Sequence, residues 1–294
     1  MPIAPSRGAQ IHYSVHGSAH GTHGSPGARG TPANPAVVLV QGLGLSSRFW
    51  FDVPELLASD PARPRFVLAL DNRGTGGSSR PGGVWTMGTM ADDVVAVLDH
   101  AGVDAAFIVG ISMGGMIAQH VALRHPSRVK GLVLIATTSS FLLGALPEAA
   151  ALARLLSIPF GGPRAAKNLG RLLLPESKWP RAREIFRDWP SAMRDDPTTA
   201  GTFAAHLFAA STHLVTPRLR NLRCPAVVVA GSHDVLVPLR NAQVLAREIP
   251  GAELEIVAET GHAVFAEDRD LVRRMVVRLE KSIEKGLDAT TLGL

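Results

Sequence analysis

The sequence predicts an α/β protein with a mostly parallel, doubly wound sheet that is interrupted by one helical insertion. Short apolar runs bounded by turn residues recur along the 294 residues, and helical patterns lie between them. Each run is aliphatic through its length instead of alternating with polar residues, which is typical of a parallel sheet covered by helices on both faces. With 46% hydrophobic and 19% charged residues, the composition excludes disordered and fibrous chains.

The strands are expected where the apolar runs lie. An alternating segment at 10–15 predicts an antiparallel strand at the sheet edge, followed by a loop over 17–35 that is rich in Gly, Pro, Ser and His. Further on, Thr89 is expected to cap a helix that ends before Gly102. The runs expected to form the parallel strands are 36–40, 66–70, 105–109, 132–136, 226–230 and 253–258.

The alternation of strands and helices stops between residues 137 and 223. We therefore expect a core domain of residues 1–136 and 224–294, with 137–223 inserted as helices whose apolar side chains form a small core or face a cleft. The insertion holds 12 Lys and Arg residues against 6 Asp and Glu. This excess is either a solvated face or a surface that attracts an anionic substrate or an acidic carrier protein. The basic residues considered for such a surface are Arg164, Lys167, Arg171, Arg181 and Arg183.

No feature points to nucleic acid, a membrane span, a metal or a cofactor. The net charge is +5, but no basic run is interleaved with aromatic residues, so we expect no nucleic-acid partner. Apolar runs stay short of the ~18 residues of a membrane span, the N-terminus lacks an apolar signal segment, and Cys224 has no cysteine partner, which together predict a cytoplasmic protein. Without nearby carboxylates, His12, His16, His20 and His23 do not predict a metal site.

A candidate nucleophile lies in the pentapeptide from Gly110 to Gly114, which follows one expected strand and opens a helix. Between strand and helix the chain turns so sharply that small residues are needed on both sides of Ser112. Such a strained turn exposes the serine hydroxyl at the N-terminus of a helix, where free amides favour negative charge. Ser112 is therefore the predicted nucleophile.

A serine hydroxyl needs a base, and the base needs an acid that orients it. Asp234 follows the expected strand at 226–230, and His262 follows the next strand, so both lie at the carboxyl ends of strands. The chain order Ser112, Asp234, His262 is one known order of a catalytic triad. His233 is the alternative base, but we interpret it as a loop residue beside the site.

The oxyanion of an acyl-transfer intermediate requires rigid backbone donors. The turn over 41–44 follows the strand expected at 36–40. We expect the amides of Leu43 and Met113, the latter directly after the nucleophile, to form this oxyanion hole. A plain strand-to-helix turn is the alternative interpretation of 41–44.

These motifs, together with the loop over 71–78 (DNRGTGGS), resemble the α/β-hydrolase fold family along nearly the whole chain. The resemblance is to the branch of esterases, lactonases, cofactor-free haloperoxidases and carbon–carbon bond hydrolases. It implies that 137–223 is a helical cap over the serine and that Asp71 and Arg73 are structural. Gln41 stands where many members have histidine, which leaves the support of the oxyanion turn open.

The predicted function is hydrolysis of a carboxylic ester through an acyl-enzyme, with a medium-sized lipophilic small molecule as substrate and no cofactor. A carbon–carbon bond hydrolase, a lactonase or a cofactor-free haloperoxidase would use the same residues. Relatives that attack carbon with an aspartate are disfavoured by the serine at position 112. A receptor on this scaffold is the alternative outside the enzymes, and turnover of a simple ester distinguishes it.

Overall fold

The computed structural model describes residues 1–17, 35–158, 162–196 and 198–291 and confirms the predicted fold class. Eight strands form one sheet in the order β1-β2-β4-β3-β5-β6-β7-β8, parallel from β4 to β8. Most of the loop expected over 17–35 lies outside the described residues. The strands are β1 Ile3–Ser6, β2 Ala9–His16, β3 Ala36–Val40, β4 Phe66–Leu70, β5 Ala106–Ile111, β6 Val129–Ile135, β7 Ala226–Gly231 and β8 Glu253–Val257.

The six parallel strands lie where the apolar runs predicted them, within three residues at either end. The prediction for 10–15 is wrong in one respect. This segment is β2, which pairs antiparallel with β4 on one side and with β1 on the other, so β1 forms the edge of the sheet. β1 escaped prediction because it has only four residues, too few to establish an alternating pattern.

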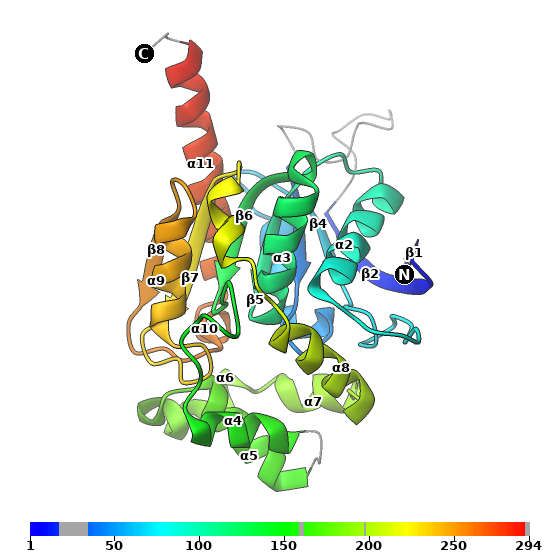
Figure 1. The fold of residues 1–294 in the computed structure, drawn as a ribbon, viewed down its shortest axis with the longest axis vertical. Helices are drawn as coiled ribbons and strands as arrows, with labels where there is room; N and C mark the ends of the chain where they lie inside the picture. Colours follow the sequence, from blue (N-terminus) through cyan, green and yellow to red (C-terminus); the bar gives the residue numbers. More distant parts are fainter. Residues whose placement is uncertain (18–34, 159–161, 197, 292–294) are drawn as a thin grey trace.

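Helices cover both faces of the sheet (Figure 1). Val38 and Val40 of β3 pack with the apolar faces of α2, α3 and α9, whereas Val37 and Leu39 pack with α1 and α11 on the opposite face. The sheet is therefore buried on both sides, which explains its continuous apolar runs. These helices are α1 Val53–Ala58, α2 Met87–Ala101, α3 Met113–Arg124, α9 Leu239–Glu248, α10 Val264–Glu267 and α11 Leu271–Thr291, with 3-10 turns at Ser47–Trp50 and Pro126–Arg128.

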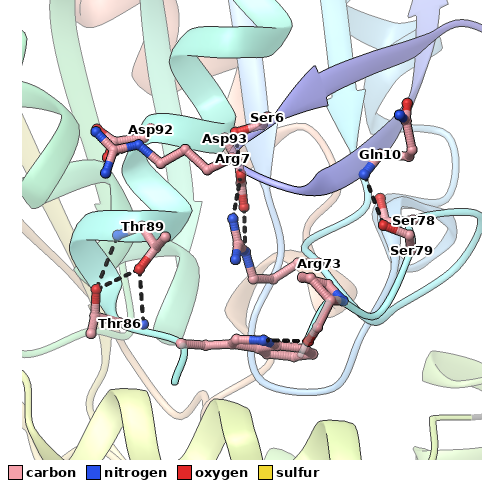
Figure 2. Close-up of polar contacts among 12 residues, drawn as sticks. Ser6, Arg7, Gln10, Arg73, Ser78, Ser79, Thr86, Thr89, Asp92 and Asp93 are labelled. Carbon is pink, nitrogen blue, oxygen red and sulfur yellow. Dashed lines mark hydrogen bonds and ion pairs between the residues drawn. The ribbon is translucent and has the colours of Figure 1, made fainter. Parts of the chain in front are cut away.

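The helix expected to start at Thr89 starts three residues earlier. Thr86 is the N-cap of α2, because its side-chain oxygen accepts a hydrogen bond from the Thr89 amide at 3.1 Å. The Thr89 hydroxyl oxygen in turn accepts from the Thr86 amide at 3.2 Å, which completes a capping box (Figure 2). Thr89 is thus the partner of the cap. The predicted end is confirmed by Gly102, which has a left-handed φ of 67°.

Between β6 and β7 the chain forms helices that gather at the carboxyl ends of the strands (Figure 1). We call residues 137–223 the insert. Part of its apolar surface forms a small core in which Trp189 and Ile185 pack with Phe49 from the sheet domain. The insert contains α4 Ala149–Ser157, α5 Gly162–Leu173, α6 Ala182–Ile185, α7 Trp189–Asp195 and α8 Ala200–Ser211, with 3-10 turns at Glu176–Arg181 and Thr216–Asn221. Within the described residues, no helix is both long and apolar enough to span a membrane.

Candidate active site

Ser112 lies in the sharp turn between β5 and α3 that the sequence predicted. Its backbone has φ 54° and ψ −119°, a strained conformation for a residue with a side chain. A Cβ at Gly110 would lie 2.3 Å from the carbonyl oxygen of Gly114, and one at Gly114 would lie 2.1 Å from the carbonyl oxygen of Val40. Only glycine fits at these two positions, so the turn depends on both.

His262 and Asp234 form a hydrogen-bonded pair in the loops that follow β8 and β7. The distance from His262 Nδ1 to Asp234 Oδ2 is 2.8 Å, and both residues are buried. Asp234 Oδ1 accepts hydrogen bonds from the amides of Leu236 and Val237 at 2.9 and 2.8 Å, which fixes the carboxylate. Because the Asp234 carboxylate accepts a hydrogen bond from Nδ1–H of His262, Nε2 is the basic nitrogen of the neutral ring.

Ser112 and His262 line the same cavity, which has a volume of about 290 Å³. In the part of the chain that the structure describes, no hydrogen bond joins the Ser112 hydroxyl to the His262 ring. Catalytic hydrogen bonds of this kind are often long in a free enzyme and shorten when substrate binds. The structure thus places the predicted nucleophile and the predicted base in the lining of one cavity, with no hydrogen bond between them in the described residues.

A second cavity of about 80 Å³ shares lining residues with the first, Ser112 among them. Leu43 and Ser112 line both cavities, and Met113 lines the smaller one. Met113 is the first residue of α3, where backbone amides have no partner within the helix. Among the described residues, the Leu43 amide donates no hydrogen bond either. Leu43 and Met113, whose amides are expected to form the oxyanion hole, thus line the smaller cavity together with Ser112.

Most of the other histidines in the described residues have polar partners. His233 is exposed, and its Nδ1 lies 2.9 Å from the Ser232 hydroxyl, so it does not line the described cavities. His12 contacts Asp71 at 2.7 Å, while His20 and His23 lie outside the described residues. Within the described ranges, the side chains that bind metals do not form a group of three or more. Partners at hydrogen-bond distance also exist for His16 with Ser14 and Glu55, His100 with Tyr13, and His125 with Asp92.

Arg73 lies in the loop after β4 and forms a buried ion pair with Asp93 of α2. Its Nε and one terminal nitrogen each donate to Asp93 at 2.7 Å, and the Ser6 hydroxyl donates to the same carboxylate at 2.6 Å (Figure 2). Burial raises the pKa of Asp93, while Arg73 and Ser6 favour the ionised form. The pair ties the loop to α2 and β1 and does not line either described cavity.

Apolar side chains of the insert form part of the walls of the larger cavity, among them Leu169, Trp189 and Phe203. Its titratable lining residues are His262 and Asp196. The basic residues of the insert do not contribute to either described cavity: Arg181 pairs with Glu184, Arg171 stacks on Trp179, Lys167 and Arg183 are exposed, and the Arg164 side chain lies outside the described residues. Among the described residues, neither cavity is thus lined by a lysine or an arginine that would pair with an anionic substrate.

One residue near the site was not predicted. His206 of α8 is fully buried, and its Nδ1 lies 3.1 Å from the amide nitrogen of Gly44, next to Leu43. The neighbours of His206 in the sequence are apolar, so no local motif singles it out. Gln41 has a more limited role: its side-chain oxygen accepts from the Gly42 amide at 3.0 Å, and its side-chain nitrogen is buried without a partner in the described residues.

The chain belongs to the alpha/beta hydrolase fold family, whose model matches residues 35–269. This confirms the predicted family and the prediction that the protein is a hydrolase. The chain is similar to the Variovorax paradoxus protein named "Putative carbamate hydrolase RutD". The two are 32% identical over 262 residues, which cover 86% of this chain and 89% of the relative.

Two solved structures are also similar at 25% identity. One is Est816, described as an N-acyl homoserine lactone degrading enzyme, which matches with a TM-score of 0.73 over 94% of this chain and 98% of that chain. The other is the esterase RhEst1 from Rhodococcus sp. ECU1013, with a TM-score of 0.75 over 96% of this chain and 98% of that chain.

Proposed function

We propose that the protein is a serine hydrolase that cleaves carboxylic esters of medium-sized lipophilic molecules. The observation that carries this proposal is the common cavity of Ser112 and the hydrogen-bonded His262–Asp234 pair. The strained turn presents the hydroxyl, and the oriented imidazole supplies the base. The apolar walls contributed by the insert favour a substrate with several methylene groups.

In the proposed reaction, Ser112 Oγ attacks the acyl carbon while His262 Nε2 takes its proton. The oxyanion accepts hydrogen bonds from the Leu43 and Met113 amides, and Asp234 holds the ring and stabilises its charged form. The ester bond then breaks, and the imidazolium gives its proton to the departing alcohol. Water, deprotonated by the same ring, attacks the acyl-enzyme, and the carboxylic acid leaves as Ser112 regains its proton.

The insert, residues 137–223, acts in this proposal as a cap on the remaining core domain. Its side chains supply part of the apolar wall of the larger cavity, while the sheet domain supplies Ser112 and His262. A cap of this kind excludes water from the reacting atoms and strengthens the electrostatic interactions there.

The test is turnover of a butyrate ester by the wild type and by two variants, Ser112→Ala and His262→Ala. Each should lower kcat by 10³ to 10⁶, as removal of triad members does, with an unchanged circular dichroism spectrum. His233→Ala is the matched control and should keep near-normal turnover. Near-normal activity of a folded Ser112→Ala or His262→Ala protein contradicts the proposal, as does a wild type that binds the ester without turnover.

Carbamate hydrolysis is a second candidate, because the Variovorax relative is named for it. A carbamate offers the same acyl carbon to the same residues. The apolar cavity favours a lipophilic ester over a small polar carbamate. Comparing kcat/KM for an ester, a carbamate and a lactone of equal carbon number distinguishes the three, and we expect the ester to be the best substrate.

A further inference from the structure

His206 connects three segments of the molecule. It lies in α8 of the insert, its Nδ1 is 3.1 Å from the Gly44 amide nitrogen after β3, and its Nε2 is 2.9 Å from the Arg73 carbonyl oxygen after β4. An amide only donates and a carbonyl only accepts, so Nδ1 must accept and Nε2 must carry the hydrogen. These two contacts fix the tautomer of the ring.

The surroundings of His206 keep the ring neutral and immobile. The side chain is 0% exposed, and its ring lies 5.6 Å from that of Trp85, measured between centroids. Burial, with a contribution from the Arg73 charge, lowers the pKa of His206 to about 4. The ring therefore retains its lone pair for Gly44 at neutral pH.

The insert holds both polar groups of Gly44. His206 accepts from its amide, and the Thr198 hydroxyl donates to its carbonyl oxygen. Gly44 has a φ of +73°, and a Cβ there would lie 3.4 Å from the Thr198 methyl group. The Gly44 amide belongs to the peptide unit that directly follows Leu43, so holding that unit restricts the backbone of Leu43.

Helix α8, which carries His206, also contacts the loop after β4 through Thr202. The Thr202 hydroxyl donates to the Gly74 carbonyl oxygen at 3.1 Å, one residue from the Arg73 carbonyl that His206 binds. At the other end of the turn, the Gln41 side-chain oxygen accepts from the Gly42 amide, and the Gln41 carbonyl oxygen accepts from the Asn72 side-chain nitrogen at 2.9 Å. Contacts from the insert therefore hold the Gly44 end of the turn over 41–44 from outside its own segment.

We propose that His206 is a positioning residue that holds the Leu43 amide in the orientation needed for the oxyanion. In this arrangement the oxyanion hole is complete only while α8 of the insert is docked on Gly44 and the loop after β4. The inference rests on the proposed function, in which the Leu43 amide is a donor. It adds that the insert, besides forming the cavity wall, organises the catalytic backbone.

Three substitutions separate the two hydrogen bonds of the ring. His206→Phe removes both and keeps the ring volume. His206→Asn retains an acceptor at the position of Nδ1, whereas His206→Gln retains a donor at the position of Nε2. We expect the Phe and Gln variants to lose about 10- to 100-fold in kcat, less than the loss of a whole oxyanion donor, with KM within about threefold of wild type. The Asn variant should recover kcat to within a few-fold.

The affinity for a boronate that forms a tetrahedral adduct with Ser112 is a second measurement, which a change in protein stability alone does not alter. This affinity should fall in parallel with kcat in the Phe and Gln variants, while binding of an unreactive amide analogue stays the same. His213→Phe, which replaces another buried histidine away from the turn, is the control and should leave both parameters near wild type.

The inference is overturned if Asn and Gln lose activity equally, if Gln is the better variant, or if KM rises while kcat is unchanged. Should the Phe variant fail to fold, the comparison of Asn with Gln decides the question. Failure of the proposed function has a different signature, because Ser112→Ala would then keep its turnover whatever the His206 variants do.

Discussion

The two cavities at Ser112 predict that the alcohol and acyl sides of the ester respond differently to chain length. Of the two described cavities, His262 lines the larger one, of about 290 Å³, and in the proposed mechanism it protonates the departing alcohol. We therefore predict that the alcohol side of the substrate extends into the larger cavity and the acyl chain into the cavity of about 80 Å³.

Burial of a methylene contributes about 0.8 kcal/mol, which corresponds to about a fourfold gain in kcat/KM for each methylene added. Three further methylenes on the alcohol should thus raise kcat/KM by up to about 60-fold, as an upper limit. The acyl series should gain at the first one or two methylenes and then level off, because the smaller cavity fills earlier.

Two substitutions in the insert narrow one cavity each. Leu169 lines the larger cavity and Leu152 the smaller, and both side chains are half-buried, so tryptophan can replace either with little strain on a core. Leu169→Trp should flatten the alcohol series and leave the acyl series unchanged. Leu152→Trp should do the reverse, so that each variant serves as the control for the other.

The assay is titration of the released acid at constant pH, with one series of alkyl propionates and one of ethyl esters. The ratio kcat/KM includes every step up to the acyl-enzyme, so it reports on both groups of the substrate. The assignment of groups to cavities is wrong if kcat/KM rises equally with chain length in the two series. It is also wrong if Leu169→Trp changes how kcat/KM depends on the length of the acyl chain.

Asp234→Asn should lower kcat by about 10⁴-fold because the ring can then take the wrong tautomer, and a loss below tenfold in steady-state assays contradicts the role of Asp234. Burial lowers the pKa of His206 to about 4 and of His213 to about 3. The unfolded chain, with an ordinary pKa near 6.5, binds these protons first, so the free energy of unfolding should fall between about pH 6.5 and pH 4, by on the order of 3 kcal/mol for each ring. Urea titrations between about pH 4 and pH 6.5 measure this fall, and in His213→Phe the free energy of unfolding should depend less on pH. Glu280→Gln weakens a buried contact of 2.8 Å to Arg65 and should cost about 3 kcal/mol of stability at unchanged turnover, whereas equal urea midpoints would refute a stabilising role.

The sheet could be predicted because its signal is local. A strand buried on both faces is apolar at every position, so β3 and β4 have the bounds that the sequence indicated. The start of α2 was placed three residues late because Thr86 and Thr89 are both good capping residues, and only the reciprocal hydrogen bonds show which one is the cap. The arrangement of the helices in the insert depends on side-chain packing, which no motif encodes.

Similar reasoning separates the parts of the candidate site. The Ser112 turn is strained, and strain selects glycine at neighbouring positions, which leaves a visible pattern in the sequence. Asp234 and His262 are recognisable because each follows a strand in a fixed order. No such constraint marks His206, whose partner Gly44 is 162 residues away in the sequence.

The reacting residues of the candidate site and the residues that support the turn over 41–44 therefore leave different traces in the sequence. A nucleophile and its base need particular residue types at the ends of particular strands, so a single sequence can indicate them. The support of the oxyanion turn needs only an acceptor for the Gly44 amide, and any element that reaches this point can supply it. In this molecule His206 of α8 supplies the acceptor, while the hydroxyl of Thr198, which precedes α8, donates to the Gly44 carbonyl oxygen. Because Phe203 of the same helix lines the larger cavity, the proposed support of the Leu43 amide and the wall of the cavity depend on one element, α8.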